Sequence, residues 1–344
     1  MLCGVLSIRP IAALAITIAI GIALVIVPVD EACAQDADPI KVVATIKPVH
    51  SLLAGVMEGV ATPTLLLDGP ASPHTYTLKP SDVRRLSDAD LVIMVSGRLE
   101  TFMARIGRSL PTSVALIALD QAPGLIHLEV REGGAFEADG DHHGHAAHAA
   151  STAAPAPPAA QADGHDGHDG HEHDPHIWLD PLNAKAMVAQ LAVVLSGAAP
   201  RHSAVFQANA AKVMARLDAL SASIGRDLSG VRQRPFIVFH DAYQYFEARF
   251  GMPAAGAITI NPEIPPGAKR LAQLRAKITS ARAVCVFSEP QFDSKLVQTL
   301  VDGTAAKIGS LDANGAAVTP GPDAYFMMIQ DLAVSLKTCL AADS

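Results

Sequence analysis

The sequence predicts an α/β protein with two Rossmann-like lobes, each made of alternating strands and helices, and a long helix that connects them. A short apolar strand followed by a helix opens two separate stretches of the chain, residues 41–120 and 236–312. One long amphipathic stretch lies between them. The 344 residues are 50% hydrophobic and 17% charged, which is typical of a folded protein with room for two domains.

The first strand and helix of the two halves follow the same order. Lys41–Ile46 is a short apolar strand, and a helical stretch from Ser51 to Gly59 follows it. In the second half the strand is Phe236–Phe239 and the helix is Ala242–Phe250. Strands that alternate with helices predict a parallel sheet with helices on its faces.

The rest of each half repeats as well. Pro80–Ile106 and Pro266–Leu300 both indicate a helix, a buried apolar strand, a turn and a second helix. Ser113–Asp120 resembles Ala306–Asp312, a strand that ends in Asp. Because ligands bind at the carboxyl ends of the strands in open α/β sheets, two facing lobes would form a ligand cleft from their loops.

The stretch between the halves predicts the connecting helix. From Pro200 to Leu228, apolar residues recur at steps of three or four. A helix of this length would extend about 43 Å. We therefore expect an N-terminal lobe at 35–199, the connecting helix at 200–229 and a C-terminal lobe at 230–344.

The first residues predict export. Arg9 precedes a long apolar run, Ile11–Val27, and small residues follow it at Ala32-Cys33-Ala34, as at a signal-peptide cleavage site. The run is about 17 residues long, at the border between a signal peptide and a membrane span. The cleavage sequence favours a signal peptide over residues 1–34, with a retained anchor as the alternative.

Cleavage would leave two cysteines, Cys285 and Cys339. An even pair in an exported protein predicts one disulfide, and two buried thiols are the alternative.

A histidine-rich loop is expected at 138–173, inside the N-terminal lobe. Histidine alternates there with Gly, Asp and Ala, and imidazole binds zinc, copper, nickel and iron. A solvated insertion without a role is the alternative. The formal charge of −8 argues against nucleic acid as a partner. The candidate auxiliary ligands in this loop are His142, His143, His145, His148, His165, His168, His171 and His173.

Three other histidines lie at or after the ends of predicted strands. His74 follows the strand Thr64–Leu67, His240 closes the strand after Pro235, and His176 comes directly before a helix that opens at Asp180-Pro181. Three imidazoles with a fourth position for water or carboxylate suit tetrahedral Zn²⁺, whereas oxygen-rich sites favour manganese, calcium or magnesium.

The chain resembles a known family in the elements KPVH, ASPHTYTLKPSDVRRLSDADLV, HDPHIWLDP, FHDAYQYF, NPEIPPGAKRL and VFSEPQF. These are similar to the zinc-binding solute-binding proteins of bacterial ABC importers, the ZnuA type, over residues 40–340. The resemblance implies a periplasmic, non-enzymatic monomer that carries Zn²⁺ to a permease and its ATPase, with a zinc chaperone as a candidate partner. It also implies three ligands, His74, His176 and His240, and a Cys285–Cys339 disulfide.

The chain departs from the family at one place. Some members carry Glu just before the first ligand histidine, where this chain has Pro73. The fourth ligand would then be water or another carboxylate, and Asp312 is our candidate because manganese-type relatives place an Asp there. Asp312 can instead simply begin a turn. Those relatives tend to have Glu in place of His240, so His240 favours zinc over manganese.

Two other functions stay open on the sequence alone. A three-histidine zinc site with an open position could belong to a hydrolase or hydratase. A manganese-type binding protein or an adhesin could share the fold. Glu289 and Asp241 are candidates to orient ligand imidazoles, because such histidines usually donate their second N–H to a carboxylate or carbonyl.

Overall fold

The computed structural model describes residues 39–131, 136, 172–260, 262, 264 and 266–341. The expected signal peptide and most of the histidine-rich loop lie outside these residues. The described part contains two four-stranded parallel sheets, as the sequence predicts.

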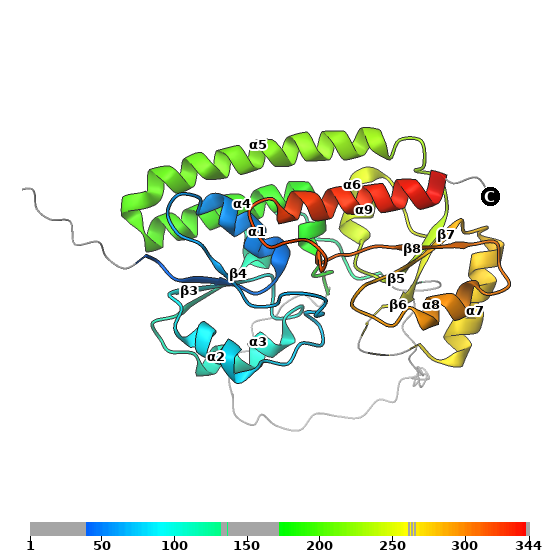
Figure 1. Cartoon of the computed structure of the whole chain (residues 1–344), viewed down its shortest axis with the longest axis horizontal. Coiled ribbons are helices and arrows are strands. Elements are labelled where there is room, and N and C mark those ends of the chain that lie inside the picture. Colours follow the sequence, from blue (N-terminus) through cyan, green and yellow to red (C-terminus); the bar gives the residue numbers. More distant parts are fainter. Residues whose placement is uncertain are drawn as a thin grey trace, which may run out of the picture. The chain divides into compact units, whose positions relative to one another are not determined.

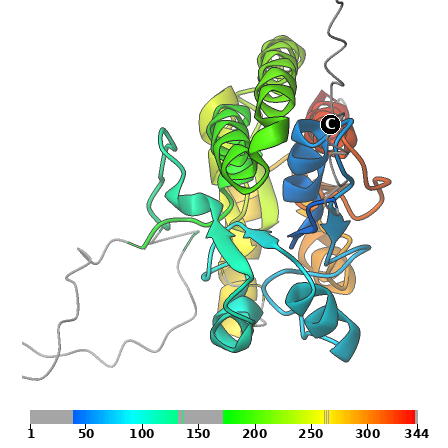
Figure 2. The same ribbon diagram turned by 90° about the vertical axis from the view of Figure 1, so that its left-hand side faces the viewer.

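The first sheet has the strand order β2-β1-β3-β4, and every pair of neighbours is parallel. Its helices lie on both faces, with α1 and α4 on one side and α2 and α3 on the other (Figures 1 and 2). The elements are β1 (Val42–Ala44), α1 (Lys47–Val56), β2 (Thr64–Leu65), α2 (Pro80–Ser87), β3 (Leu91–Met94), α3 (Thr101–Ile106), β4 (Ala115–Ala118) and α4 (Pro181–Ala198).

The second sheet repeats this topology with the order β6-β5-β7-β8, again all parallel. In both sheets the first strand lies inside and the second strand lies at one edge, so the two halves share one connection pattern. The elements are β5 (Phe236–His240), α6 (Gln244–Phe250), β6 (Gly256–Thr259), α7 (Ala268–Ser280), β7 (Cys285–Ser288), α8 (Lys295–Val301) and β8 (Lys307–Ser310).

Two long helices join the halves, α5 (Ser203–Asp227) and α9 (Ala324–Ala341). Figure 1 shows α5 extending from the first half toward α6, and α9 extending from beside α1 across the second half. The apolar face of α5 that the sequence indicates is buried at Val213, Leu217 and Ile224. The predicted fold class, two α/β lobes with a long connecting helix, is therefore confirmed. The helix is shorter than expected because residues 200–202 form a separate 3-10 turn before it.

Two helix starts follow local rules. α1 begins at Lys47, earlier than the Ser51 expected from the sequence, because Pro48 is favourable in a first turn, where its missing N–H costs nothing. α4 begins at Pro181 after Asp180, whose side chain accepts a hydrogen bond from the Leu182 N–H, as the sequence predicts for an N-cap.

The two halves share one continuous apolar core, which includes residues of β1, α4 and α5 as well as β5 and α9. Buried polar contacts add to it: the Trp178 indole N–H donates to the Ala313 carbonyl at 2.8 Å, and the Tyr325 hydroxyl donates to the Trp178 carbonyl at 2.8 Å. The segment that carries Trp178 is thus fixed against the C-terminal half from two sides.

The structure contains the expected disulfide. Cys285 in β7 is joined to Cys339 in α9 across 54 residues of sequence. Within the described ranges, no helix is both long and apolar enough to cross a bilayer.

Replacing both Cys285 and Cys339 with Ser removes this crosslink. We expect the free energy of unfolding to fall by about 3–4 kcal/mol, because the loop of the unfolded chain is no longer closed. Urea denaturation of the variant and of the parent protein measures the difference. An unchanged unfolding midpoint would show that the crosslink contributes nothing to stability.

Candidate metal centre

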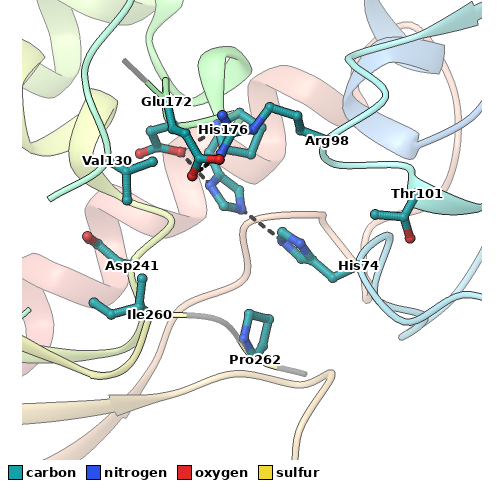
Figure 3. A pocket seen from close by; sticks show the side chains of 11 residues that line it. His74, Arg98, Thr101, Val130, Glu172, His176, Asp241, Ile260 and Pro262 are labelled. Atoms are coloured by element: carbon teal, nitrogen blue, oxygen red, sulfur yellow. Dashed lines mark hydrogen bonds and ion pairs between the residues drawn. The ribbon is translucent and has the colours of Figure 1, made fainter. Parts of the chain in front are cut away.

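Three imidazoles converge at one point of the structure. One ring nitrogen from each of His74, His176 and His240 lies within 4.8 Å of the other two. The Nε2 atom of His176 is 3.1 Å from that of His74 and 3.4 Å from that of His240. Figure 3 shows His74 and His176 facing each other across the pocket. Three nitrogen ligands at this spacing can surround a single ion such as Zn²⁺.

The fold explains why residues so far apart in sequence meet. His240 is the last residue of β5, at the carboxyl end of the second sheet. His74 lies in the loop that follows β2, and His176 lies in the segment before α4. Ligands of α/β sheets bind at these strand ends, and here the loops of both sheets contribute to one site.

Two of the three rings are held by buried carboxylates. The Nδ1 atom of His176 lies 2.7 Å from Asp174 Oδ1, and the Nδ1 atom of His240 lies 2.6 Å from Glu289 Oε1. An ionised carboxylate can only accept, so Nδ1 carries the proton and Nε2 presents its lone pair to the centre. The ring of His74 has no carboxylate partner among the residues that the structure describes.

The sequence identified only part of this support. Glu289 is a candidate from the sequence, and the structure pairs it with His240. Asp174 is a further partner that the sequence analysis misses, although it stands two residues before His176 in the motif HDPH. Its Oδ1 atom accepts from both the backbone and the ring of His176, a local loop contact that this spacing allows. Asp241 instead binds Arg131, whose Nε lies 3.0 Å from Asp241 Oδ2.

The environment sets the protonation of the three rings. Burial, together with the neighbouring imidazoles, lowers the pKa of His74 and of His176 well below 6.5. Burial also acts to lower the pKa of His240, but the charge and hydrogen bond of Glu289, together with the charges of Asp241 and Asp174, outweigh it and raise this pKa above 6.5. Two rings are therefore neutral near pH 6.5, while the third holds a proton that a bound cation must displace.

The cavity beside the three rings is small, about 260 Å³. Its lining includes His74 and His176 at the imidazole cluster and the acidic residues Glu172, Asp174 and Asp241. Pockets for organic ligands usually measure about 300–1,000 Å³, so this volume suits a hydrated ion better than an organic substrate.

Asp312, the candidate for a fourth ligand, does not belong to this cluster. Its Oδ1 atom accepts from the side chain of Gln291 at 2.8 Å and from the backbone of Asn314, and its Oδ2 atom accepts from the backbone of Ala316. The carboxylate thus closes its own turn, which is the alternative that the sequence left open. The described residues offer no fourth side-chain ligand within the cluster.

Of the eight auxiliary histidines expected in the histidine-rich loop, only His173 lies among the described residues. Its side chain is exposed, its backbone pairs with Glu129 in an antiparallel bridge, and its ring lies 5.1 Å from that of His127. The positions outside the description are His142, His143, His145, His148, His165, His168 and His171.

Known proteins resemble this chain closely. The family described as ZnuA, zinc-uptake complex component A periplasmic, matches residues 42–339. The high-affinity zinc uptake system protein ZnuA of Brucella suis biovar 1 (strain 1330) is 48% identical over 309 residues, covering 87% of this chain and 91% of that protein.

Solved structures share the fold. A crystal structure of ZnuA superposes with a TM-score of 0.69 at 22% identity, covering 88% of this chain and all of that one, 100%. The periplasmic zinc binding protein TroA of Treponema pallidum gives a TM-score of 0.70 at 21% identity, covering 89% of this chain and 100% of that chain.

The carboxylate pairing makes a prediction for metal-free protein. Replacing Glu289 with Gln should lower the pKa of His240 below its value in the parent protein, because the charge that favours the imidazolium is removed while burial remains. Histidine-detected NMR titration measures this pKa. The matched control is Asp218→Asn, which removes an exposed carboxylate paired with Lys185 and should leave His240 unchanged. An unshifted His240 in Glu289→Gln would contradict the assignment.

Proposed function

The chain belongs to the ZnuA family of periplasmic zinc-uptake components, and from this membership we propose that it captures Zn²⁺ at His74, His176 and His240. It is the solute-binding component of a zinc ABC importer, and it works with a membrane permease and its ATPase. The zinc ion is cargo, so its binding must be reversible. Only coordination bonds to the ion form and break, and no covalent bond of the protein changes.

The observation that carries this proposal is the convergence of three imidazoles whose free nitrogens all face one point. An all-nitrogen set suits zinc, whereas manganese and magnesium prefer carboxylate and carbonyl oxygens. Since the described residues place no fourth side chain in the cluster, we propose that water completes the tetrahedron.

A hydrolytic function receives less support from the same site. Catalysis at zinc usually needs a general base that is free to take a proton. The carboxylates around this pocket are engaged: Asp174 Oδ1 holds His176, Glu289 holds His240, Asp241 binds Arg131 and Glu172 binds Arg98. Among the described residues, the Oδ2 atom of Asp174 is the one buried carboxylate oxygen of these pairs without a hydrogen-bond partner. The small cavity also leaves little room for an organic substrate. Solved adhesins on this fold are 20% identical and share the fold alone.

Three further features belong to the proposal. Residues 1–34 act as a cleaved signal peptide for export to the periplasm, and the mature chain works as a monomer that can receive zinc from a periplasmic chaperone. The lobes are divided as the sequence predicts, at 35–199 and 230–344. The histidine-rich loop at 138–173 is auxiliary, so it adds weak metal binding beside the main site.

Alanine at His74, His176 or His240 should each lower zinc affinity on the order of 100-fold or more, because loss of a direct ligand should cost at least as much as loss of its supporting partner. Calorimetric titration with metal analysis of the mature protein measures affinity and stoichiometry. Two controls should keep one tight site: His202→Ala, which lies in the 3-10 turn before α5, and deletion of residues 138–173. Tight binding that survives all three alanine changes would refute the assignment.

Zinc affinity should also depend on pH, because one of the three rings, His240, must lose a proton when zinc binds. The pKa of His240 is raised, so the ring gains a proton as pH falls through this value, and zinc must then displace it. Below that pKa we expect affinity to fall about tenfold per pH unit, since His74 and His176 remain neutral there. Calorimetry in buffers of different ionisation enthalpy counts the released protons. A flat affinity from pH 7.5 to 5.5 would contradict this, as would release of three protons.

A further inference from the structure

One ion pair lies among the exposed residues that line the metal pocket. Nη2 of Arg98 is 3.1 Å from Oε2 of Glu172, and their side chains are 47% and 76% exposed. Both residues line the pocket, whereas Asp174, His176 and Asp241 in the same lining are buried. The third exposed lining residue is Thr101. The three exposed residues therefore mark where the pocket opens to solvent.

Figure 3 shows Arg98 and Glu172 above His176, on the opposite side of the ring cluster from Pro262. Arg98 follows β3 and Glu172 belongs to the segment that precedes His176. An ion that reaches or leaves the imidazoles on this side passes close to a guanidinium and a carboxylate.

The backbone on each side of this opening is fixed. Behind Arg98, the buried Glu100 accepts hydrogen bonds from the hydroxyl of Thr45 at 2.6 Å and from the backbone of Val95 and Ser96. Behind Glu172, its carbonyl accepts from the Val130 N–H at 2.8 Å. Opening the pair therefore requires only side-chain rotation, which is fast for exposed residues.

The charges that line the pocket determine how the pair acts on an approaching cation. Among the described residues of the lining, Arg98 is the one lysine or arginine, and the acidic residues are Glu172, Asp174 and Asp241. Glu172 attracts an approaching divalent cation, while Arg98 repels it.

We propose that the Arg98–Glu172 pair is a charge gate that sets the rate at which divalent cations enter and leave the pocket. The proposal rests on zinc binding at the three histidines. A barrier at the opening acts on passage in both directions, so it changes the association and dissociation rates by the same factor and leaves the equilibrium affinity nearly unchanged. An exposed ion pair is worth little stability and opens often, so the barrier comes from the two charges and not from a closed contact.

Three variants test the gate. In Arg98→Gln the repulsion is lost and Glu172 is free, so both rates for Zn²⁺ should rise about 3- to 10-fold at 10 mM salt, on a Coulomb estimate for a divalent ion several ångströms from one charge. In Glu172→Gln an unpaired Arg98 remains, and both rates should fall by a similar factor. The double variant should return to within about twofold of the parent protein, as expected for coupled partners. All three effects should shrink at 0.5 M salt, where screening is strong.

The single tryptophan supplies the signal for stopped-flow measurement, since the ring of Trp178 lies 5.3 Å from that of His176. Association is followed on mixing with Zn²⁺, and dissociation on mixing the zinc-loaded protein with excess chelator. The matched control is Arg216→Gln, which breaks an ion pair with Asp323 of similar exposure, 48% and 67%, away from the pocket.

The outcomes separate the gate from the proposed function. Rates in Arg98→Gln that match those of Arg216→Gln overturn the gate, and so does a change in equilibrium affinity that accounts for the whole effect. Parent protein that binds no zinc in calorimetry overturns the proposed function instead. The gate is supported if both rates change together while the equilibrium affinity stays within about threefold of that of the parent protein.

Discussion

The site depends on three imidazole nitrogens that lie within a few ångströms of one another. Neutral rings can approach this closely because burial disfavours their charged forms, which explains the lowered pKa values of His74 and His176. The third ring, His240, would be repelled if all three were charged. Glu289, together with the charges of Asp241 and Asp174, favours the protonated form of this ring. At most one of the three rings is therefore charged near pH 6.5, and a zinc ion bound there would have one proton to displace.

The fold around the three rings fixes their positions relative to one another. The two sheets each contribute loops at their strand ends, so the distance between the ligands depends on how the sheets are joined. A shared apolar core, the helices α5 and α9, and the contacts of Trp178 with Ala313 and Tyr325 join them over a wide area. The Cys285–Cys339 disulfide ties the second sheet to α9. Such a frame restricts large hinge motion, so small movements of loops and side chains are the natural route for an ion.

Much of the fold and part of the site could be predicted from the sequence. The doubled strand–helix order, the amphipathic face of α5 and the Asp180 cap are local patterns, and local patterns determine element type. His74, His176 and His240 could be proposed because each lies at a strand end or beside a helix start. Asp312 lies at an equivalent strand end, yet its carboxylate bonds to Gln291 and to the backbone of its own turn. A strand-end position shows where a residue lies, whereas its hydrogen-bond partner depends on side-chain geometry that the sequence does not contain.

The three histidines that we propose as ligands also differ in how firmly they are held, and this difference bears on the proposed capture and release. His176 and His240 are each fixed by a buried carboxylate, so little rotational freedom remains to be lost when they bind a cation. His74 lacks such a partner among the described residues and is more exposed than the other two. In the proposed role, a cation therefore meets two oriented nitrogens first, and binding of the third restricts a freer side chain. Release of the cation should begin at His74, because the ligand that loses most rotational freedom on binding regains most when the cation leaves. A carrier must bind tightly and still hand over its ion, and one unsupported ligand beside two supported ones satisfies both demands within a rigid frame.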